Sequence, residues 1–217
     1  MATQINQTRR CVLIAGAPCA DVPFIRQTVC GDDYVICADR GYAVAQAAGV
    51  VPDLLVGDFD SYTGALPAAV ERLTLPVEKD FSDTLHAAEA GLQRGMRRFV
   101  LLNATGGRLD HTLANLSVLE WLQNRGAEGR ILSATEDVRL LPVGAHAFDG
   151  CTGLTFSVFP FGCEAVTLSY RGAKYPLQSG VLHHGSAMGL SNIFTADTAC
   201  ITVERGQALV VLNRGAV

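Results

Sequence analysis

The stretch "LLVGDFDSY", residues 54–62, runs from three hydrophobic residues into a glycine, two aspartates separated by one residue, and a serine. Aspartate is a poor strand residue, so a fold gains little from two of them here. In an extended backbone, residues two apart point the same way, which would aim the carboxylates of Asp58 and Asp60 at one spot. At about 4 Å and an effective dielectric constant of about 20, such a pair repels by about 4 kcal/mol. Either the chain turns and separates the two carboxylates, or a cation lies between them.

Around this stretch, from residue 10 to about 135, short apolar runs alternate with segments of helical periodicity. The alternation predicts an α/β domain, a doubly wound and mainly parallel sheet with helices on both faces. The helix expected near residue 83 has a possible N-cap in Ser82 or Asp83. We expect strands at 10–17, 34–39, 53–60, 98–105 and, with a weaker pattern, 130–135, and helices near 41–49, 65–73, 83–95 and 111–124.

The pattern changes near residue 140, where helical periodicity stops and short strands alternate with turns that contain Gly and Pro. This pattern is typical of an all-β domain, a β-sandwich or a jelly-roll-like barrel. We therefore expect two domains, 1–138 and 139–217. The strands expected in the second domain are 145–150, 154–162, 165–170, 199–205 and 207–213.

Composition and charge exclude several classes of protein. The 217 residues are 49% hydrophobic and 18% charged, which is ordinary for a globular protein. The net charge of -4 argues against a nucleic-acid partner, and no apolar run approaches the ~18 residues of a membrane helix. The N-terminal segment has no signal-peptide pattern, and the seven cysteines are scattered without a C-x-x-C pair. We expect a cytoplasmic protein that binds no membrane, with its cysteines as small buried hydrophobic residues.

Unusual polar residues follow several of the expected strands. Asp39 ends one strand, Asp58, Asp60 and Ser61 end the next, and the segment 105–111, "TGGRLDH", follows a third. In a doubly wound sheet, ligands bind beyond the carboxyl ends of the strands. A single aspartate at a strand end is as often a helix cap or a turn residue. Polar residues at three strand ends of one edge make a shared site the better explanation.

The "TGGRLDH" segment has the residue types of a phosphate site. Gly106 and Gly107 let the backbone approach a ligand closely and turn N–H groups toward phosphate oxygens. Arg108 adds a forked donor suited to phosphate. A Gly-Gly pair is also an ordinary strand-to-helix turn, and Asp110 is equally well explained as the N-cap of the next helix.

Three further polar features are ambiguous. The segment 78–84, "EKDFSDT", offers a lysine for phosphate and a carboxylate for metal, but it also fits a capped helix start. His111 and Asn115 lie four apart and share one helix face, which a solvated polar face explains equally well. The adjacent His183 and His184 lack zinc-site spacing and are expected in a loop or sheet.

The acidic edge suits a complex of a metal ion with a nucleotide. In proteins Mg²⁺ takes one or two carboxylates, several waters and substrate phosphates. An edge rich in aspartate, with Gly-Gly-Arg and a lysine nearby, provides such ligands. The chain has no Walker A motif, no G-x-G-x-x-G and no protein-kinase signature.

Taken together, these motifs resemble those of the thiamine pyrophosphokinase family over nearly the whole chain. "CADRGY" (37–42) resembles its A-D-G-G segment, and "PDLLVGDFDS" (52–61) its P-D-x-x-x-G-D-x-D-S motif. "EKDFSDT" is similar to K-D-x-T-D-x, and "TGGRLDHTLAN" (105–115) to G-x-x-G-x-R-x-D-H-x-x-x-N. "GLSNIFT" (189–195) resembles the S-N segment of the thiamine-binding domain.

The resemblance implies a two-domain enzyme, with ATP handled by residues 1–138 and thiamine bound with the help of the β-sandwich of residues 139–217. It implies transfer of the β,γ-pyrophosphate of ATP to the hydroxyl of thiamine, giving thiamine diphosphate and AMP, with Mg²⁺ required. It also implies a homodimer with active sites at the subunit interface. Whether a side chain acts as an obligatory general base stays open, because phosphoryl transfer can rely on positioning and electrostatics.

The resemblance also implies roles for individual residues. The metal ligands would be Asp39, Asp58, Asp60 and Asp83, which would explain the paired carboxylates. The residues near ATP would be Asp39, Arg40, Gly41, Ser61, Lys79, Asp80, Thr84, Gly106, Gly107, Arg108, His111 and Asn115. The residues near thiamine would be Asp110, Tyr175, Ser191 and Asn192. The catalytic set would be Asp58, Asp60, Asp83, Arg108 and Asp110.

Some positions depart from the family pattern. Arg40 replaces the first glycine of A-D-G-G, and Ser82 stands where threonine is usual. Tyr175 replaces the tryptophan of a G-L-K-W-x-L segment, and the chain's only tryptophan, Trp121, lies on an expected helix. Aromatic stacking on thiamine would therefore come from Tyr175, another Tyr or a Phe.

Two alternative functions compete with this one. The first keeps pyrophosphoryl transfer but changes the acceptor, for instance to a hydroxymethyl-pterin; the β-rich second domain with Ser191 and Asn192 favours thiamine. The second is a thiamine- or nucleotide-binding module without catalysis. The acidic set argues against it, because nucleotide binding alone does not need four carboxylates.

Overall fold

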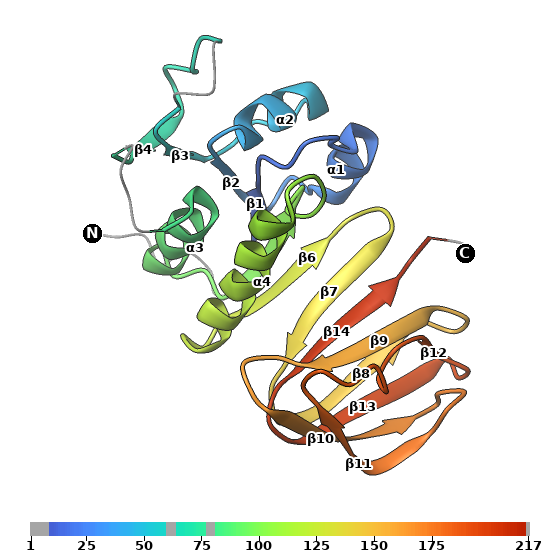
Figure 1. Ribbon diagram of the computed structural model, residues 1–217. Coiled ribbons are helices and arrows are strands. Elements are labelled where there is room, and N and C mark those ends of the chain that lie inside the picture. The colour runs from blue at the N-terminus through green and yellow to red at the C-terminus, as the bar shows by residue number, and fades with distance from the viewer. Residues whose placement is uncertain (1–8, 60–63, 77–80, 216–217) are drawn as a thin grey trace. The chain divides into compact units, whose positions relative to one another are not determined.

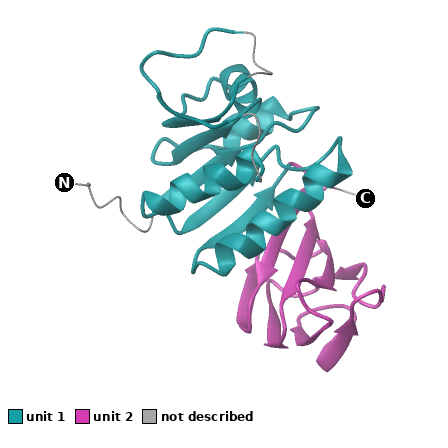
Figure 2. Ribbon diagram, turned by 60° about the vertical axis from the view of Figure 1, so that its left-hand side comes forward, with its two compact units in different colours: residues 1–133 teal, residues 134–217 magenta. Residues whose placement is uncertain are grey.

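The structure is a computed structural model that describes residues 9–59, 64–76 and 81–215. It separates into two compact units, residues 1–133 and 134–217 (Figure 2). Strand β7 (Glu136–Leu141) spans the position between residues 138 and 139 where the sequence suggested a boundary, and all of it belongs to the second unit.

The first unit contains a parallel sheet whose strands lie in the order β6-β5-β1-β2-β3-β4 (Figure 1). The side chains of β1, β2 and β3 are buried almost throughout, as expected for strands covered on both faces. The predicted α/β fold class is therefore confirmed. The strands are β1 (Arg10–Ile14), β2 (Tyr34–Ala38), β3 (Leu54–Gly57), β4 (Glu71–Thr74), β5 (Arg98–Leu102) and β6 (Glu128–Leu132).

The strand order reverses between β1 and β5. The chain moves outward from β1 to β4 and then returns to β5 on the other side of β1. Figure 1 shows α1 and α2 together on one face of this sheet and α3 and α4 on the other. A reversal of this kind leaves a crevice at the carboxyl ends of the two central strands, where doubly wound proteins bind ligands. The helices are α1 (Val22–Thr28), α2 (Gly41–Ala48), α3 (Asp83–Gln93) and α4 (Leu109–Gln123).

Helices α1 and α3 each begin with a side-chain cap. Ser82 caps α3, because its Oγ accepts a hydrogen bond from the backbone N–H of Leu85 at 3.3 Å. Helix α1 was not expected from the sequence, although Asp21 caps it by accepting from Phe24 N and Pro23 lies in its first turn. Asp110 is not the N-cap of α4: it lies inside the first turn of the helix.

The predicted helix at 65–73 is wrong. In the described residues 64–76 the chain forms β4 instead, which pairs with β3 in parallel from Leu54↔Glu71 to Gly57↔Thr74. Leu66 and Val70 do pack against the core of this unit, so their four-residue spacing imitated a helical stripe. The unpaired backbone groups at the edge of β3 decided the outcome, because pairing satisfies hydrogen bonds that local periodicity does not reveal.

The second unit is a β-sandwich. One sheet has the order β12-β9-β14-β7 within this unit, and the other the order β11-β10-β13-β8. Side chains from both sheets form its core, where the ring of Phe156 stacks on Phe194 with centroids 4.1 Å apart and meets Tyr170 edge-on. β7, β11 and β12 were not expected from the sequence. Besides β7, the strands are β8 (Gly144–Asp149), β9 (Thr155–Pro160), β10 (Ala165–Arg171), β11 (Leu177–His183), β12 (Asn192–Ile193), β13 (Thr198–Arg205) and β14 (Ala208–Asn213).

All seven cysteines lie within the described residues, and each carries a free thiol. Cys11 and Cys37 are fully buried on β1 and β2, and burial raises the pKa of both thiols. Cys19 and Cys30 are exposed, so the expectation of buried cysteines holds for part of the set. None of the helices that residues 9–59, 64–76 and 81–215 build has the length and hydrophobicity to cross a bilayer.

Candidate active site

The loops after β1 and β5 are bound to each other at the reversal of strand order. Ala15 N donates to Leu102 O at 2.9 Å, and Ala17 N donates to Asn103 O at 3.2 Å. The side chain of Asn103 completes the connection, because its Nδ2 donates to the carbonyls of Ala15 and Ala17 at 2.9 and 2.7 Å. No local signal pointed to Asn103, since its partners lie more than eighty positions away in the chain. This side chain ties the loop after β5 to the loop after β1.

The glycine pair after β5 lies against the β1 loop. Gly106 and Gly107 have φ angles of +93° and +72°, which favour glycine, and both are exposed. A Cβ added at Gly107 would lie 2.2 Å from Cγ of Pro18, whereas one added at Gly106 would meet nothing within 4 Å. Gly107 is therefore required by contact as well as by backbone conformation. The pair places exposed backbone just beyond the carboxyl end of β5, as a phosphate-binding loop needs.

Asp39 lies at the same edge, between the ends of β1 and β3. Its backbone N–H donates to Val56 O at 2.8 Å, and its φ angle is +43°. A Cβ added at Gly57 would lie 3.2 Å from the Asp39 backbone, so the chain approaches closely here. Gly41, the first residue of α2, leaves no room for a side chain, because a Cβ there would lie 1.9 Å from Ile14 O. Close packing thus fixes Asp39 and Gly41 at the β1–β2 edge.

Arg40 occupies the N-cap position of α2 without a side-chain capping bond, and it is exposed. A Cβ added at Gly16, in the β1 loop, would lie 2.9 Å from the Cβ of Arg40. The arginine that departs from the family pattern therefore stands beside the loop after β1.

The predicted metal ligands are brought together only in part. Asp58 follows β3 directly, so it shares an edge with Asp39, and both are half-buried. Asp83 is the first residue of α3. Among residues 9–59, 64–76 and 81–215, no three His, Cys, Asp or Glu side chains gather as metal ligands would. The fourth predicted ligand, Asp60, lies outside the described residues, as do three residues predicted to lie near ATP: Ser61, Lys79 and Asp80.

Arg108 and Asp110 contact each other. Arg108 Nη2 lies 2.5 Å from Asp110 Oδ2, and its Nε donates to Oδ1 at 3.1 Å. The backbone N–H of His111 also donates to Oδ1, at 2.9 Å. The Arg108 guanidinium lowers the pKa of Asp110 from its ordinary value to about 2, chiefly by this hydrogen bonding. Asp110 is therefore a carboxylate at neutral pH, and both side chains are exposed.

The structure separates the predicted ATP residues of α3 and α4 by their burial. His111 is exposed in the first turn of α4. Asn115 is buried, and its Nδ2 donates to the carbonyl of Ala104 at 2.7 Å. Thr84, in the first turn of α3, is 8% exposed. Asn115 thus anchors the loop that carries the glycine pair to α4.

Three of the four residues predicted to contact thiamine, Tyr175, Ser191 and Asn192, lie together in the second unit, whereas Asp110 lies on α4 in the first. Ser191 is exposed, has a φ angle of +59°, and donates its backbone N–H to Ser157 Oγ at 3.1 Å. Asn192 is buried and forms hydrogen bonds with the backbone of Tyr175. Tyr175 is 60% exposed.

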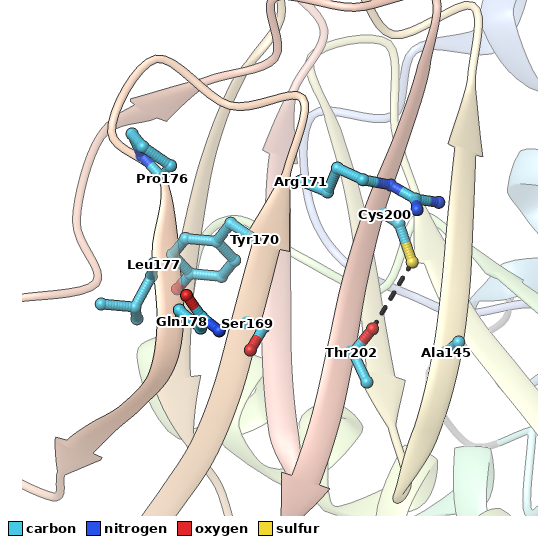
Figure 3. A pocket seen from close by; sticks show the side chains of 9 residues that line it. All are labelled: Ala145, Ser169, Tyr170, Arg171, Pro176, Leu177, Gln178, Cys200 and Thr202. Atoms are coloured by element: carbon cyan, nitrogen blue, oxygen red, sulfur yellow. Dashed lines mark hydrogen bonds between the residues drawn. The ribbon is translucent and has the colours of Figure 1, made fainter.

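A hollow of about 750 Å³ lies elsewhere in the second unit (Figure 3). It is lined by Arg171 and Ser169 of β10, by Cys200 and Thr202 of β13, and by residues of β8 and β11. In Figure 3 the thiol of Cys200 points toward the hydroxyl of Thr202, at 3.6 Å. None of the side chains predicted to contact thiamine lines this hollow.

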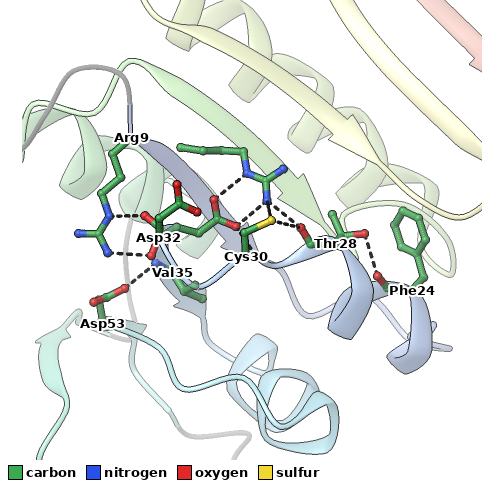
Figure 4. A network of polar contacts seen from close by, with 9 residues as sticks. Arg9, Phe24, Thr28, Cys30, Asp32, Val35 and Asp53 are labelled. Carbon is green, nitrogen blue, oxygen red and sulfur yellow. Dashed lines mark hydrogen bonds and ion pairs between the residues drawn. The ribbon is translucent and has the colours of Figure 1, made fainter. Parts of the chain in front are cut away.

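A second polar cluster lies at the opposite end of β1 (Figure 4). Arg10 pairs with the buried carboxylate of Asp33 at 2.5 Å, and Arg9 donates to the carbonyls of Asp32 and Asp33. Asp53 accepts from Val35 N at 2.8 Å. These contacts hold the starts of β1, β2 and β3 together, so the cluster has a structural role away from the crevice.

Comparison with known proteins assigns this arrangement of two units to a family. The model described as "Thiamin pyrophosphokinase, catalytic domain" matches residues 25–130, and "Thiamin pyrophosphokinase, vitamin B1 binding domain" matches residues 146–208. The chain belongs to the thiamin pyrophosphokinase family. The resemblance inferred from the motifs is thereby confirmed, and the pterin and non-catalytic alternatives are not favoured.

Individual members of the family are distant in sequence and close in fold. Thiamine pyrophosphokinase of Bacillus subtilis is 24% identical over 92% of this chain and 96% of its own length. The crystal structure of the Bacillus subtilis protein has a TM-score of 0.85 at 22% identity, covering 96% of this chain and all of that one. Thiamin pyrophosphokinase from Candida albicans has a TM-score of 0.76 at 17% identity, with coverages of 94% and 88%. The thiamin pyrophosphokinase fold is thus present along nearly the whole chain.

Proposed function

We propose that this chain transfers the β,γ-pyrophosphate of ATP to the hydroxyl of thiamine, giving thiamine diphosphate and AMP. The observation that carries the proposal is the meeting of two family motifs at one sheet edge. Asp58 of G-D-x-D-S follows β3, while Gly107, Arg108 and Asp110 of G-R-x-D-H follow β5. A catalytic-domain match and a vitamin B1 binding-domain match in one chain support both substrates.

In this reaction the thiamine hydroxyl oxygen forms a bond to the β-phosphorus of ATP. The bond between that phosphorus and the oxygen bridging to the α-phosphorus breaks, AMP leaves with the oxygen, and the hydroxyl proton passes to solvent. Arg108 would hold the phosphate oxygens together with Lys79, and the N–H groups of Gly106 and Gly107 would contact them at close range. Fixed donors of this kind stabilise the charge that develops during transfer.

Arg108 has a partner, Asp110, that nucleotide binding would release. The guanidinium pairs with Asp110 in the described chain, and both groups face solvent. When a phosphate takes the guanidinium, the Asp110 carboxylate would turn to the thiamine hydroxyl and orient it. The carboxylate is already ionised at neutral pH, so it accepts that hydrogen bond without first losing a proton. His111, Arg40, Gly41 and Asp39 would complete the nucleotide side of the crevice.

The chain has the donor chemistry of a Mg²⁺ site. The carboxylates of Asp39 and Asp58 follow adjacent parallel strands, and Mg²⁺ needs one or two carboxylates beside waters and phosphates. We assign Asp39 and Asp58 as ligands, with Asp60 and Asp83 as further acidic members. When bound, the ion would neutralise charge on the transferring phosphates.

We also propose that the enzyme works as a homodimer with active sites at the subunit interface. Leu109 and Leu113 flank Asp110 on α4 and are 72% and 54% exposed. In the second unit, Tyr175 and Leu190 lie near Ser191 and are 60% and 55% exposed. A second copy would cover these apolar groups and bring thiamine-binding residues to the crevice.

The free state of all seven thiols supports a reducing, cytoplasmic location.

The decisive experiment is incubation of the purified chain with ATP, Mg²⁺ and thiamine, followed by mass detection of the products. We expect thiamine diphosphate and AMP in equal amounts, and neither product when EDTA removes the metal. A parallel reaction with a hydroxymethyl-pterin tests the other acceptor. Thiamine binding without AMP formation would identify a binding module. Faster turnover of the pterin than of thiamine would identify the pterin as the substrate.

A further inference from the structure

Two segments of the second unit pair in antiparallel fashion next to Ser191. Thr195 N donates to Gly172 O at 2.8 Å, Ala173 and Phe194 form a bridge, and Lys174 N donates to Ile193 O at 2.8 Å. These contacts lead directly to Tyr175, where the next pair of backbone groups would be expected from residue 192.

At that position the pairing continues through a side chain. Tyr175 N donates to Oδ1 of Asn192 at 3.0 Å, and Nδ2 of Asn192 donates to Tyr175 O at 2.8 Å. A carboxamide presents the same C=O and N–H groups as a peptide unit, so Asn192 replaces the missing backbone partner. Its backbone is engaged elsewhere, because Asn192 pairs with Phe156 of β9.

The carboxamide of Asn192 has little capacity left for a substrate. Oδ1 also accepts from Ile193 N at 2.8 Å, which brings the total to three hydrogen bonds of the four that a carboxamide can make. The residue is only 6% exposed, whereas Tyr175 is 60% exposed. The side chain that the family resemblance placed near thiamine is thus committed to the backbone of Tyr175 and Ile193.

We infer that Asn192 is a positioning residue that fixes the backbone of Tyr175, so that the exposed ring is held ready to stack on the acceptor substrate. The inference rests on the proposed function. Its chemistry suits a flat, cationic acceptor such as thiamine, since a tyrosine face attracts both aromatic rings and cations. The Nζ of Lys174 already lies 5.4 Å from the centroid of this ring. Asn192 therefore acts on the substrate through Tyr175 and not by contact.

A double-mutant cycle separates positioning from contact. Tyr175→Ala and Asn192→Ala should each raise the KM for thiamine, by about tenfold and about fivefold, with kcat and the KM for ATP little changed. The double variant should be no worse than Tyr175→Ala alone, because Asn192 has nothing left to position. A multiplicative effect, about fiftyfold by that arithmetic, would mean direct contact and would overturn the inference.

Folding must be checked in the same variants. If Asn192→Ala does not fold, Asn192→Asp replaces it in the cycle. This substitution keeps the acceptor oxygen and the shape of the side chain but loses the donor to Tyr175 O. Thr152→Ala is the matched control, because it removes one exposed hydrogen bond, to Asp197, in the same unit. It should leave both KM values unchanged.

A second readout does not depend on activity. In a Trp121→Phe, Tyr175→Trp protein the tryptophan at position 175 is the only one, since the chain contains a single natural Trp. Adding Asn192→Ala should lower the fluorescence anisotropy of this tryptophan. Thermal unfolding should stay cooperative, which checks that the variant is folded. Unchanged anisotropy would contradict the positioning role of Asn192, whether or not the enzyme makes thiamine diphosphate. A wild-type enzyme that makes no thiamine diphosphate would contradict only the proposed function.

Discussion

The carboxamide of Asn115, on α4, donates a hydrogen bond from Nδ2 to the carbonyl oxygen of Ala104 at 2.7 Å. Both residues are buried, and Ala104 lies two positions before the glycine pair. The contact therefore joins the first turns of the helix to the loop that it follows. It also explains an asparagine at this position without requiring contact with ATP.

Asn115→Ala should lower the free energy of unfolding by about 1–3 kcal/mol, because it leaves the buried Ala104 carbonyl without a partner. Urea unfolding measures the change. Asn124→Ala, at the exposed C-cap of the same helix, is the matched control and should shift stability by less than about 0.5 kcal/mol. A raised KM for ATP with stability intact would instead return Asn115 to the nucleotide site.

Gly107→Ala should destabilise the chain more than Gly106→Ala, by about 1–3 kcal/mol. Both glycines have positive φ, so the backbone strain of about 1–2 kcal/mol is shared by the two variants. Only the Cβ at position 107 collides with Pro18. Thermal or urea unfolding of the two variants side by side gives the difference, and equal losses would show that the β1 loop yields freely.

Asp58→Asn should reduce AMP formation at least about a hundredfold while the far-UV circular dichroism stays unchanged, because a neutral amide is a poor ligand for Mg²⁺. The same result is expected for Asp60→Asn. Glu128→Gln, an exposed acid at the start of β6, controls for loss of one negative charge and should retain wild-type turnover. Near-normal activity in either aspartate variant would remove that residue from the metal site.

Arg108→Gln should raise the pKa of Asp110 from about 2 toward an ordinary value near 4, since the hydrogen-bonded guanidinium holds it down. Carboxyl ¹³C NMR titration measures the shift. The folded pKa lies below that of the unfolded chain, so the pair favours folding above about pH 4 and loses this effect as the pH falls toward 2. Both groups are exposed, so salt should weaken the shift; a pKa that stays near 2 would mean that the backbone of His111 is its cause.

Ser191→Ala should raise the KM for thiamine by about three- to tenfold and leave the KM for ATP unchanged, as the loss of one hydrogen bond to substrate predicts. Ser186→Ala removes a hydroxyl from the same loop, where it accepts from Met188 N, and serves as the control. A change confined to the KM for ATP would show that the acceptor pocket lies elsewhere.

Much of the fold follows from local pattern. The buried runs that became β1, β2, β3 and β5 are hydrophobic on both sides of the strand, a pattern typical of a parallel sheet. Ser82 was recognisable in the sequence as a helix cap. The polar residues Asp39, Asp58 and Gly106 lie at one edge of the sheet, because parallel strands place their carboxyl ends together.

The sequence by itself determined the class of each unit, the sheet edge that carries the polar motifs and, through those motifs, the family. Such features depend on residue spacing along the chain, which periodicity and strand direction convert directly into position. The tertiary structure alone decided that 71–74 pair as a strand, that Arg108 contacts Asp110, and that Asn103, Asn115 and Asn192 bind backbone groups. A carboxamide looks the same in a sequence whether it meets a substrate or a peptide group, and only the folded chain supplies its partner.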